Sequence, residues 1–179
     1  MNIFNTLSEV LEFRSFSNLW YWIVLAAAWS HASYYVMSVP FDAIRDAQKG
    51  ANSGDSDQNM ADIEISATIR ARRIMHMLNS GGKASVIGIS FLVSILAVVG
   101  FYYGSQFAQS VFLLGFPFIF VGLHLIKTAR IITSEHPTGP AMIALLLKHR
   151  FVAQIIGIFA LFFAIMWGMF TLLTTSAIG

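Results

Sequence analysis

Four stretches of about 20 residues contain no Asp, Glu, Lys or Arg, and they dominate this 179-residue chain. An α-helix of about 20 apolar residues crosses the hydrocarbon core of a bilayer. Inside that core every backbone polar group must bond within the protein, so an apolar stretch of this length crosses as a helix. We therefore predict an all-α integral membrane protein with four transmembrane helices. They are expected at residues 18–39, 84–103, 107–126 and 151–173.

The composition supports this class. Hydrophobic residues make up 56% of the chain and charged residues 11%, whereas soluble domains carry about 25% charged residues. These values argue against a soluble enzyme and against a disordered chain. The chain has no Cys, which excludes thiolate metal ligands and thiol nucleophiles. A net charge of +2 gives no nucleic-acid footprint, so we expect no nucleic-acid partner.

The basic residues predict an orientation. Residues 40–83 contain six of the 11 Lys and Arg, and residues 127–150 contain four. Only Arg14 lies elsewhere. By the positive-inside rule, both basic segments face the cytoplasm and both termini face the other side. Aromatic residues at the outer ends of the first two spans are expected to anchor them at the interface: Trp20, Tyr21, Trp22, Tyr102 and Tyr103.

The segments outside these stretches are expected to be helical in part. Residues 1–16 have apolar side chains at near-helical spacing and predict an amphipathic helix on the outer membrane surface. Residues 40–83 form a cytoplasmic helical and loop segment, in which Pro40 ends the first span. Its second helix, at about 60–78, is expected to stop at Gly81 and Gly82. That helix lies either on the inner membrane face or on a partner.

Small residues at four-residue spacing predict where the helices approach closely. The fourth span has the most regular series, and the second span carries serines followed by glycines. The predicted packing positions are Ala160, Ala164, Gly168, Ser90, Ser94, Gly100, Gly104 and Ala27.

Two histidines inside the spans are the candidate cofactor ligands, because an ionisable residue in a membrane is a functional candidate. Ala27-x-x-x-His31 resembles the Ala-x-x-x-His pattern of bacterial light-harvesting polypeptides, which implies a bacteriochlorophyll at His31. A haem held by His31 and His124 is a second version, and structural hydrogen bonding of each imidazole is the simpler alternative. No cofactor is required by the sequence. No span contains a carboxylate or a catalytic pair, so we predict that the chain is not an enzyme.

Several motifs resemble a family of small bacterial inner-membrane proteins, whose members are often labelled a component of the SufBCD complex. The resemblance lies in Arg14-Ser-Phe-Ser-Asn-Leu-Trp-Tyr-Trp, Val39-Pro40-Phe41-Asp42, Gln106-Phe-Ala-Gln-Ser-Val-Phe and Thr128-Ala129-Arg130. It implies a multi-pass protein of the bacterial inner membrane and carries over no catalytic motif. In such a membrane, the distribution of Lys and Arg predicts that both termini are periplasmic. Without Cys, the chain has no thiolate to hold an iron–sulfur cluster.

The functional hypothesis that follows is a non-catalytic accessory or assembly subunit of a larger respiratory or photosynthetic complex. Its expected partners are the lipid bilayer and other integral membrane proteins. Two alternatives stay open: a pigment- or haem-binding membrane protein that uses His31, and a small transporter or channel.

Overall fold

The computed structural model describes residues 19–37, 39–50 and 56–178. The amphipathic helix predicted for residues 1–16 lies outside them. The described chain is almost entirely helical: α2 (Leu19–Tyr34), α3 (Phe41–Gly50), α4 (Ser56–Ala97), the π-helix η2 (Val98–Tyr102), α5 (Gln106–Glu135) and α6 (Pro140–Ile178). Strands β1 (Tyr35–Val36) and β2 (Val39–Pro40) pair antiparallel, with Tyr35 opposite Pro40 and Val36 opposite Val39.

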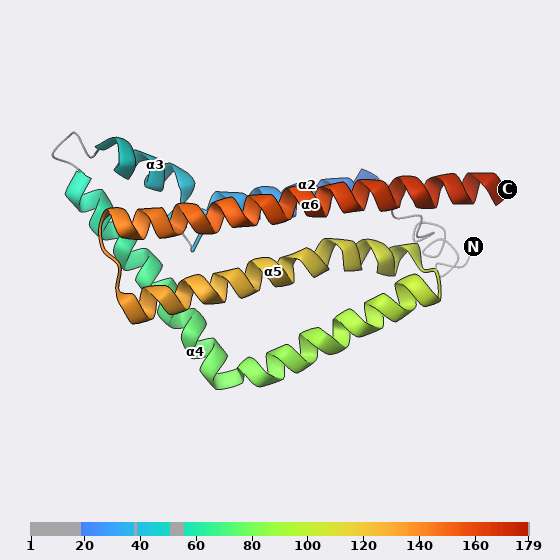
Figure 1. Ribbon diagram of the computed structural model, residues 1–179, viewed down its shortest axis with the longest axis horizontal. Helices are drawn as coiled ribbons and strands as arrows, with labels where there is room; N and C mark the ends of the chain where they lie inside the picture. Colours follow the sequence, from blue (N-terminus) through green and yellow to red (C-terminus); the bar gives the residue numbers. More distant parts are fainter. Residues whose placement is uncertain (1–18, 38, 51–55, 179) are drawn as a thin grey trace, which may run out of the picture.

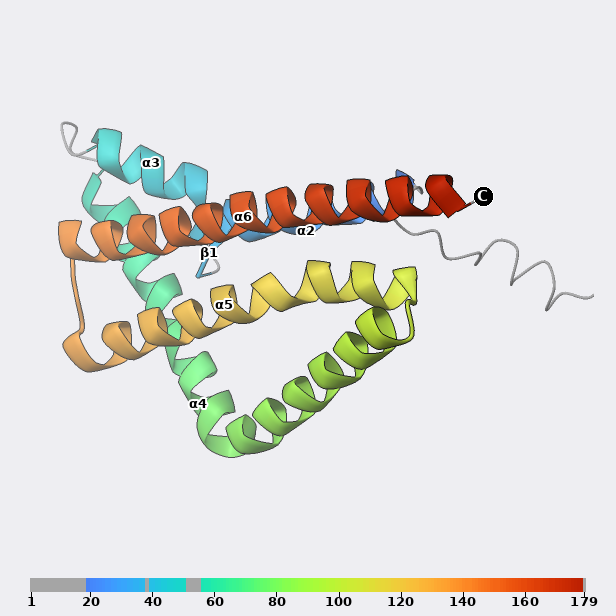
Figure 2. The same ribbon diagram turned by 45° about the vertical axis from the view of Figure 1, so that its right-hand side comes forward.

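The long helices form a layered bundle that is open on one side (Figures 1 and 2). Helix α2 lies along α6, and α5 runs below them. Helix α4 meets α5 at the η2 turn and moves away from it toward a sharp bend. Beyond the bend, the first half of α4 crosses α5 and reaches α3 and the start of α6.

Three helices are long and apolar enough to cross a membrane: Asn59–Tyr102, Gln106–Glu135 and Pro140–Thr171. They contain the predicted span at 107–126 and all but the last one or two residues of the predicted spans at 84–103 and 151–173. The fold is thus that of an all-helical membrane protein. Helix α6 also joins residues 141–150 to the last span without a break, as the sequence predicts.

The predicted first span, at 18–39, does not continue as a helix to Val39. Helix α2 ends at Tyr34, so its 16 described residues extend about 24 Å at 1.5 Å per residue. The chain then reverses through the β1–β2 pair, where Met37 has a positive φ of 52°. The apolar residues of this turn are buried in the protein, since Met37 and Val39 are each 2% exposed. Pro40 precedes α3 and does not end a span.

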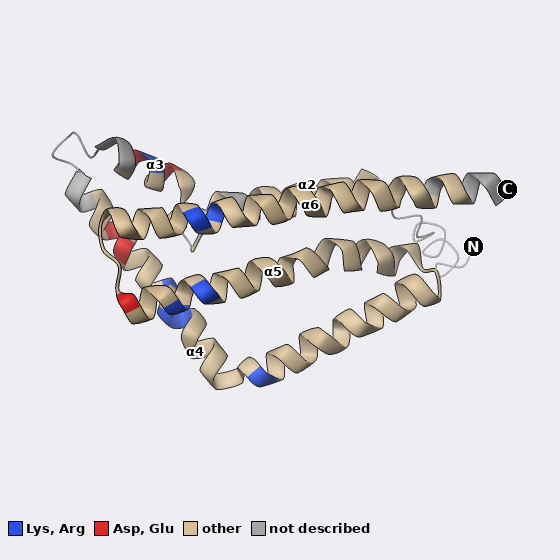
Figure 3. Ribbon diagram, in the orientation of Figure 1, with Lys and Arg blue, Asp and Glu red and all other residues tan. Residues whose placement is uncertain are grey.

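The predicted stop at Gly81 and Gly82 is also wrong. Helix α4 runs through both glycines as one element of 42 residues. A glycine inside a helix costs only about 1 kcal/mol relative to alanine, and Gly/Ser pairs commonly produce a bend in place of an end. Figure 3 shows the bend of α4 between its arginine cluster and the lysine that follows. The Ser85 hydroxyl donates to the Gly81 carbonyl at 3.1 Å.

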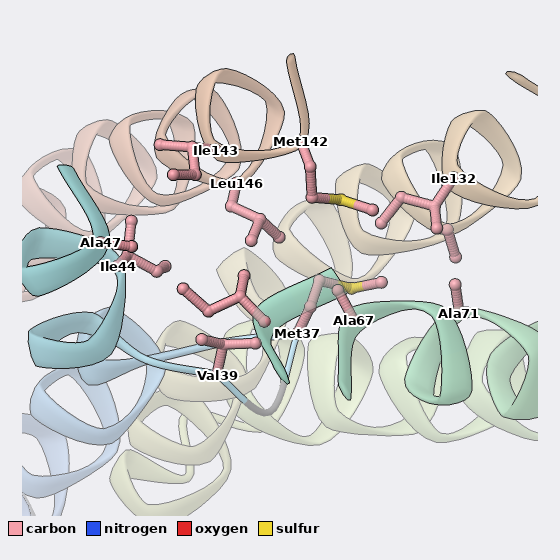
Figure 4. Close-up of a cluster of buried hydrophobic side chains, with 12 residues drawn as sticks. Met37, Val39, Ile44, Ala47, Ala67, Ala71, Ile132, Met142, Ile143 and Leu146 are labelled. Carbon is pink, nitrogen blue, oxygen red and sulfur yellow. The ribbon is translucent and has the colours of Figure 1, made fainter. Parts of the chain in front are cut away.

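A buried apolar cluster joins the β1–β2 turn to the first half of α4 and to the ends of α5 and α6 that face it (Figure 4). Ile63 and Ala67 on α4 belong to this cluster. One face of the helix predicted at about 60–78 therefore packs on the chain itself, which neither sequence alternative included. The backbone N–H of Gly139, in the α5–α6 turn, donates to the Glu64 carboxylate, and this bond ties the same half of α4 to that turn.

A second buried cluster lies between α2 and α6. Tyr21, Leu25 and Trp29 of α2 pack against Ala160 and Ala164 of α6. The small α6 residues let the large α2 side chains approach the helix backbone. Helix α2 is thereby held along α6 beside the cavity described next.

Candidate functional site

A cavity of about 640 Å³ lies between α2, α4, α5 and α6. Small-molecule sites in proteins have volumes of about 300–1,000 Å³ and are mostly apolar with a few convergent polar groups. This cavity has that character, because three side chains that carry hydrogen-bonding nitrogens join an otherwise apolar wall. Its lining residues are Ala28, His31, Ala32, Met37, Arg70, Phe118, Val121, Gly122, Leu125 and His149.

Two residues of α5, His124 and Thr128, contact the His149 ring and hold it in place. Its ring stacks face to face on His124, with the ring centroids 5.0 Å apart and an interplanar angle of 4°. Thr128 Oγ1 donates to the His124 carbonyl at 3.0 Å and lies 3.3 Å from His149 Nδ1. The Thr128 hydroxyl can donate to the His124 carbonyl and accept from Nδ1–H, or it can donate to Nδ1. Nε2 of neutral His149 is a hydrogen-bond acceptor in the first arrangement and a donor in the second.

The two histidines singled out from the sequence therefore have different positions. His31 lines the cavity, whereas His124 lies behind His149, and the His124 Nε2 atom is buried without a hydrogen-bond partner. The structure thus brings His31 and His149 to one space. An imidazole binds a metal through a lone pair in the plane of its ring. Because the rings of His124 and His149 are stacked, these lone pairs do not point toward each other, and the two residues cannot bind the metal of one flat macrocycle from opposite sides. Among the described residues, no three His, Cys, Asp or Glu gather as metal ligands.

Basic residues gather at one level of the molecule. Figure 3 shows most of the Lys and Arg of α4, α5 and α6 in a zone across the three helices, with Asp and Glu nearer to α3 and the α5–α6 turn. Of these basic residues, Arg70 lines the cavity. The Arg150 guanidinium instead lies 3.2 Å from the centre of the Phe41 ring, a cation–π contact with α3. The cavity therefore has one guanidinium and two imidazoles in an otherwise apolar lining.

A polar cluster ties three helices together at the far end of the bundle. The Gln109 side chain donates from Nε2 to the Gly100 carbonyl of η2 at 2.8 Å. Trp167 Nε1 on α6 donates to Gln109 Oε1 at 3.0 Å. Glycine at position 100 permits this close approach, because a Cβ atom there would lie only 3.0 Å from the backbone nitrogen of Gln109. A π-helical turn often marks a functional position, and here it presents a carbonyl to a neighbouring helix.

The remaining predicted positions divide between buried and exposed. Ala160, Ala164 and Gly168 are buried on α6, and Gly104 has a φ of 74° in the η2–α5 turn. Ala27, Ser90 and Ser94 are exposed. Among the expected interfacial aromatics, Trp20, Tyr102 and Tyr103 are exposed, Trp22 is half-buried, and Tyr21 is buried against α6.

A second cavity, of about 650 Å³, lies between α5 and α6 and is lined mainly by phenylalanines, including Phe112, Phe116, Phe159 and Phe163. Trp167 also lines this cavity, and its indole N–H already donates a hydrogen bond to Gln109. This cavity could orient a ligand by shape alone. The cavity with His31, Arg70 and His149 is therefore the candidate functional site.

No family model, no curated protein and no solved structure matches this chain.

Proposed function

We propose that the chain is a non-catalytic accessory or assembly subunit of a larger complex in the bacterial inner membrane, respiratory or photosynthetic. Helix α4 carries this proposal. In the most apolar 18-residue window of Asn59–Tyr102, 6% of the residues are buried, against 28% in Pro140–Thr171. A spanning helix with so little contact inside its own chain has most of its surface available to lipid or to other membrane helices.

The small residues of α4 support contact with a protein partner. Ser90 and Ser94 lie on one face of the helix and are exposed, and the Ser94 hydroxyl donates to the Ser90 carbonyl at 2.8 Å. Membrane helices associate through small residues at this spacing because their backbones can approach closely. The corresponding α6 residues are already covered by α2. The α4 face is thus a second small-residue face that the described chain leaves uncovered.

The zone of basic residues supports an orientation with both termini periplasmic. Because Lys and Arg accumulate on the cytoplasmic side of membrane proteins, the α5–α6 turn and the first half of α4 would face the cytoplasm. The η2–α5 turn would then face the periplasm. The buried apolar cluster of Figure 4 would form a small cytoplasmic layer on the membrane.

Filling the small-residue face of α4 tests the proposal. We expect the double variant Ser90→Leu/Ser94→Leu to lose at least nine-tenths of its co-migration with other membrane proteins, because added side chains hold helix backbones apart. The measurement is native gel electrophoresis of membranes solubilised in mild detergent, followed by mass spectrometry of the bands.

Gly88→Leu is the matched control. At 100° per residue, Gly88 lies about 160° around the helix from Ser90, and a Cβ atom there would have no neighbour within 4 Å. We expect this variant to keep the wild-type assembly. If the wild-type chain migrates alone in mild detergent, the proposal of a larger complex is wrong.

A further inference from the structure

We propose that the cavity between α2, α4, α5 and α6 binds one anionic phospholipid, whose phosphate lies at Arg70 and whose tail lies along the apolar wall formed by α2 and α5. A hydroxyl group of the headgroup would form a hydrogen bond with His149. This inference is independent of the proposed assembly role, because it concerns the cavity and not the exposed face of α4.

Charge at the cavity favours an anion. Arg70 forms no salt bridge with any residue that the structure describes, and no carboxylate lines the cavity. Lys127 and Lys148 lie close enough to His124, behind His149, to act electrostatically on its ring. Glu64 is the acidic residue of α4 nearest in sequence to Arg70, and its carboxylate already accepts a hydrogen bond from the Gly139 backbone N–H. A phosphate is the group that a guanidinium binds best, through two parallel hydrogen bonds.

Hydrogen-bond polarity at His149 favours a headgroup that carries a hydroxyl. The contact with Thr128 fixes the position of the His149 ring, and Nε2 accepts or donates according to the tautomer. A hydroxyl pairs with Nε2 in both tautomers because it both donates and accepts, whereas an anion with acceptors only pairs with it in one. Phosphatidylglycerol supplies both groups, a phosphate and two hydroxyls.

The apolar wall and the neighbouring basic residues favour a lipid over a small soluble anion. Small residues of α2 and α5, among them Ala28, Ala32 and Gly122, leave room beside Phe118 and Val121. A Cβ atom at Gly122 would have no neighbour within 4 Å. Two of the lining residues belong to basic stretches of the sequence, since Arg70 is followed by Arg72 and Arg73 and His149 stands between Lys148 and Arg150. Basic residues at the boundary between apolar helix and polar segment attract anionic headgroups.

Native mass spectrometry of the full chain in detergent tests the headgroup. The probe is an equimolar mixture of phosphatidylglycerol and phosphatidylcholine with identical acyl chains. We expect one phosphatidylglycerol per chain, with about a tenfold preference over phosphatidylcholine, which corresponds to about 1.4 kcal/mol. Both lipids carry the phosphate, but phosphatidylcholine ends in a quaternary ammonium that Arg70 repels and that cannot form a hydrogen bond with His149. Arg70→Gln should therefore lower the binding of phosphatidylglycerol and reduce that preference. Arg72→Gln is the matched control, because Arg72 is exposed on the same helix and does not line the cavity, and it should keep the preference.

Gly122→Leu tests the apolar wall, with Gly115→Leu as its control. Both glycines are on α5 without a neighbour within 4 Å of a Cβ atom, but only Gly122 lines the cavity. Leucine favours the helix at both positions, so folding should be preserved, and circular dichroism checks this. We expect Gly122→Leu to lower the bound phosphatidylglycerol at least fivefold and Gly115→Leu to leave it unchanged. Glycerol 3-phosphate, the headgroup without a tail, should not bind at the same concentration.

Four results would overturn the inference. Equal losses in Arg70→Gln and Arg72→Gln would indicate general attraction to a basic surface. Unchanged binding in Gly122→Leu would place the lipid elsewhere. Equal binding of glycerol 3-phosphate would identify an anion site without a tail. A Soret or near-infrared band in the purified protein that Arg70→Gln leaves intact and His31→Ala removes would assign the cavity to a macrocycle.

Discussion

Replacing Gln109 with leucine is expected to lower the free energy of unfolding by about 3 kcal/mol, because it leaves two polar groups unpaired at about 1–3 kcal/mol each. The groups are the Gly100 carbonyl, which accepts from Gln109 Nε2, and the Trp167 indole N–H, which donates to Gln109 Oε1. Leucine has about the volume of glutamine but bonds to neither. Unfolding in mixed micelles of mild detergent and dodecyl sulfate, followed by circular dichroism, measures the change.

Gln154→Leu is the control for this substitution. Gln154 is on α6, is half-buried, and makes no hydrogen bond to the residues that the structure describes. We expect its replacement to change the free energy of unfolding by less than about 0.5 kcal/mol, as is usual for a position without such a bond. Equal effects of the two substitutions would show that the cluster of Gly100, Gln109 and Trp167 does not hold the three helices together.

Adding a single methyl group at Gly157 is expected to destabilise the contact between α2 and α6 by about 2 kcal/mol, the cost of overpacking a core. A Cβ atom there would lie 2.8 Å from Cε3 of Trp29. The indole ring is also held by stacking on Phe118, with 4.6 Å between the ring centroids, which limits its movement away from Gly157. Gly157→Ala should therefore shift the unfolding transition to a lower dodecyl sulfate fraction.

Two further variants isolate this cause. Gly115→Ala, where a Cβ atom meets nothing within 4 Å, should be neutral or stabilising by up to about 1 kcal/mol through helix propensity. In a Trp29→Leu background the clash is removed, so the added cost of Gly157→Ala should fall below about 0.5 kcal/mol, a coupling that a double-mutant cycle measures. An unchanged cost in that background would contradict the packing of Trp29 on Gly157.

The helices at 84–103, 107–126 and 151–173 could be predicted from the length of their apolar stretches. A stretch that is buried in lipid can be recognised without knowing which other parts of the chain pack against it. The end of the first apolar stretch could not be predicted in this way. Met37 and Val39 are apolar because they enter a protein core, among residues of α3, α4, α5 and α6, and hydropathy does not distinguish core from lipid. Gly81 and Gly82 have the signature of a helix stop, but α4 continues through both as one bent helix, because a glycine inside a helix costs only about 1 kcal/mol relative to alanine.

The candidate site likewise combines a residue that could be identified from the sequence with residues that could not. His31 could be identified because an imidazole inside an apolar stretch is conspicuous. His149 could not, because it precedes the last apolar stretch and is preceded by a lysine, as an interfacial residue would be. Its role depends on Thr128 and His124, which are more than 20 positions away on another helix. The entry of Arg70 into the cavity depends on the bend of α4, which local sequence does not specify.

The most direct test is the accessibility of the two turns that bracket α5. The chain has no Cys, so single cysteines can be labelled without background. Tyr103 is 74% exposed, and Thr138 in the α5–α6 turn is also exposed. With a membrane-impermeant maleimide on spheroplasts, Tyr103→Cys should react at once and Thr138→Cys only after permeabilisation. Reaction of both cysteines from the same side would contradict a membrane-spanning α5, and reaction of Thr138→Cys alone from outside would contradict the orientation.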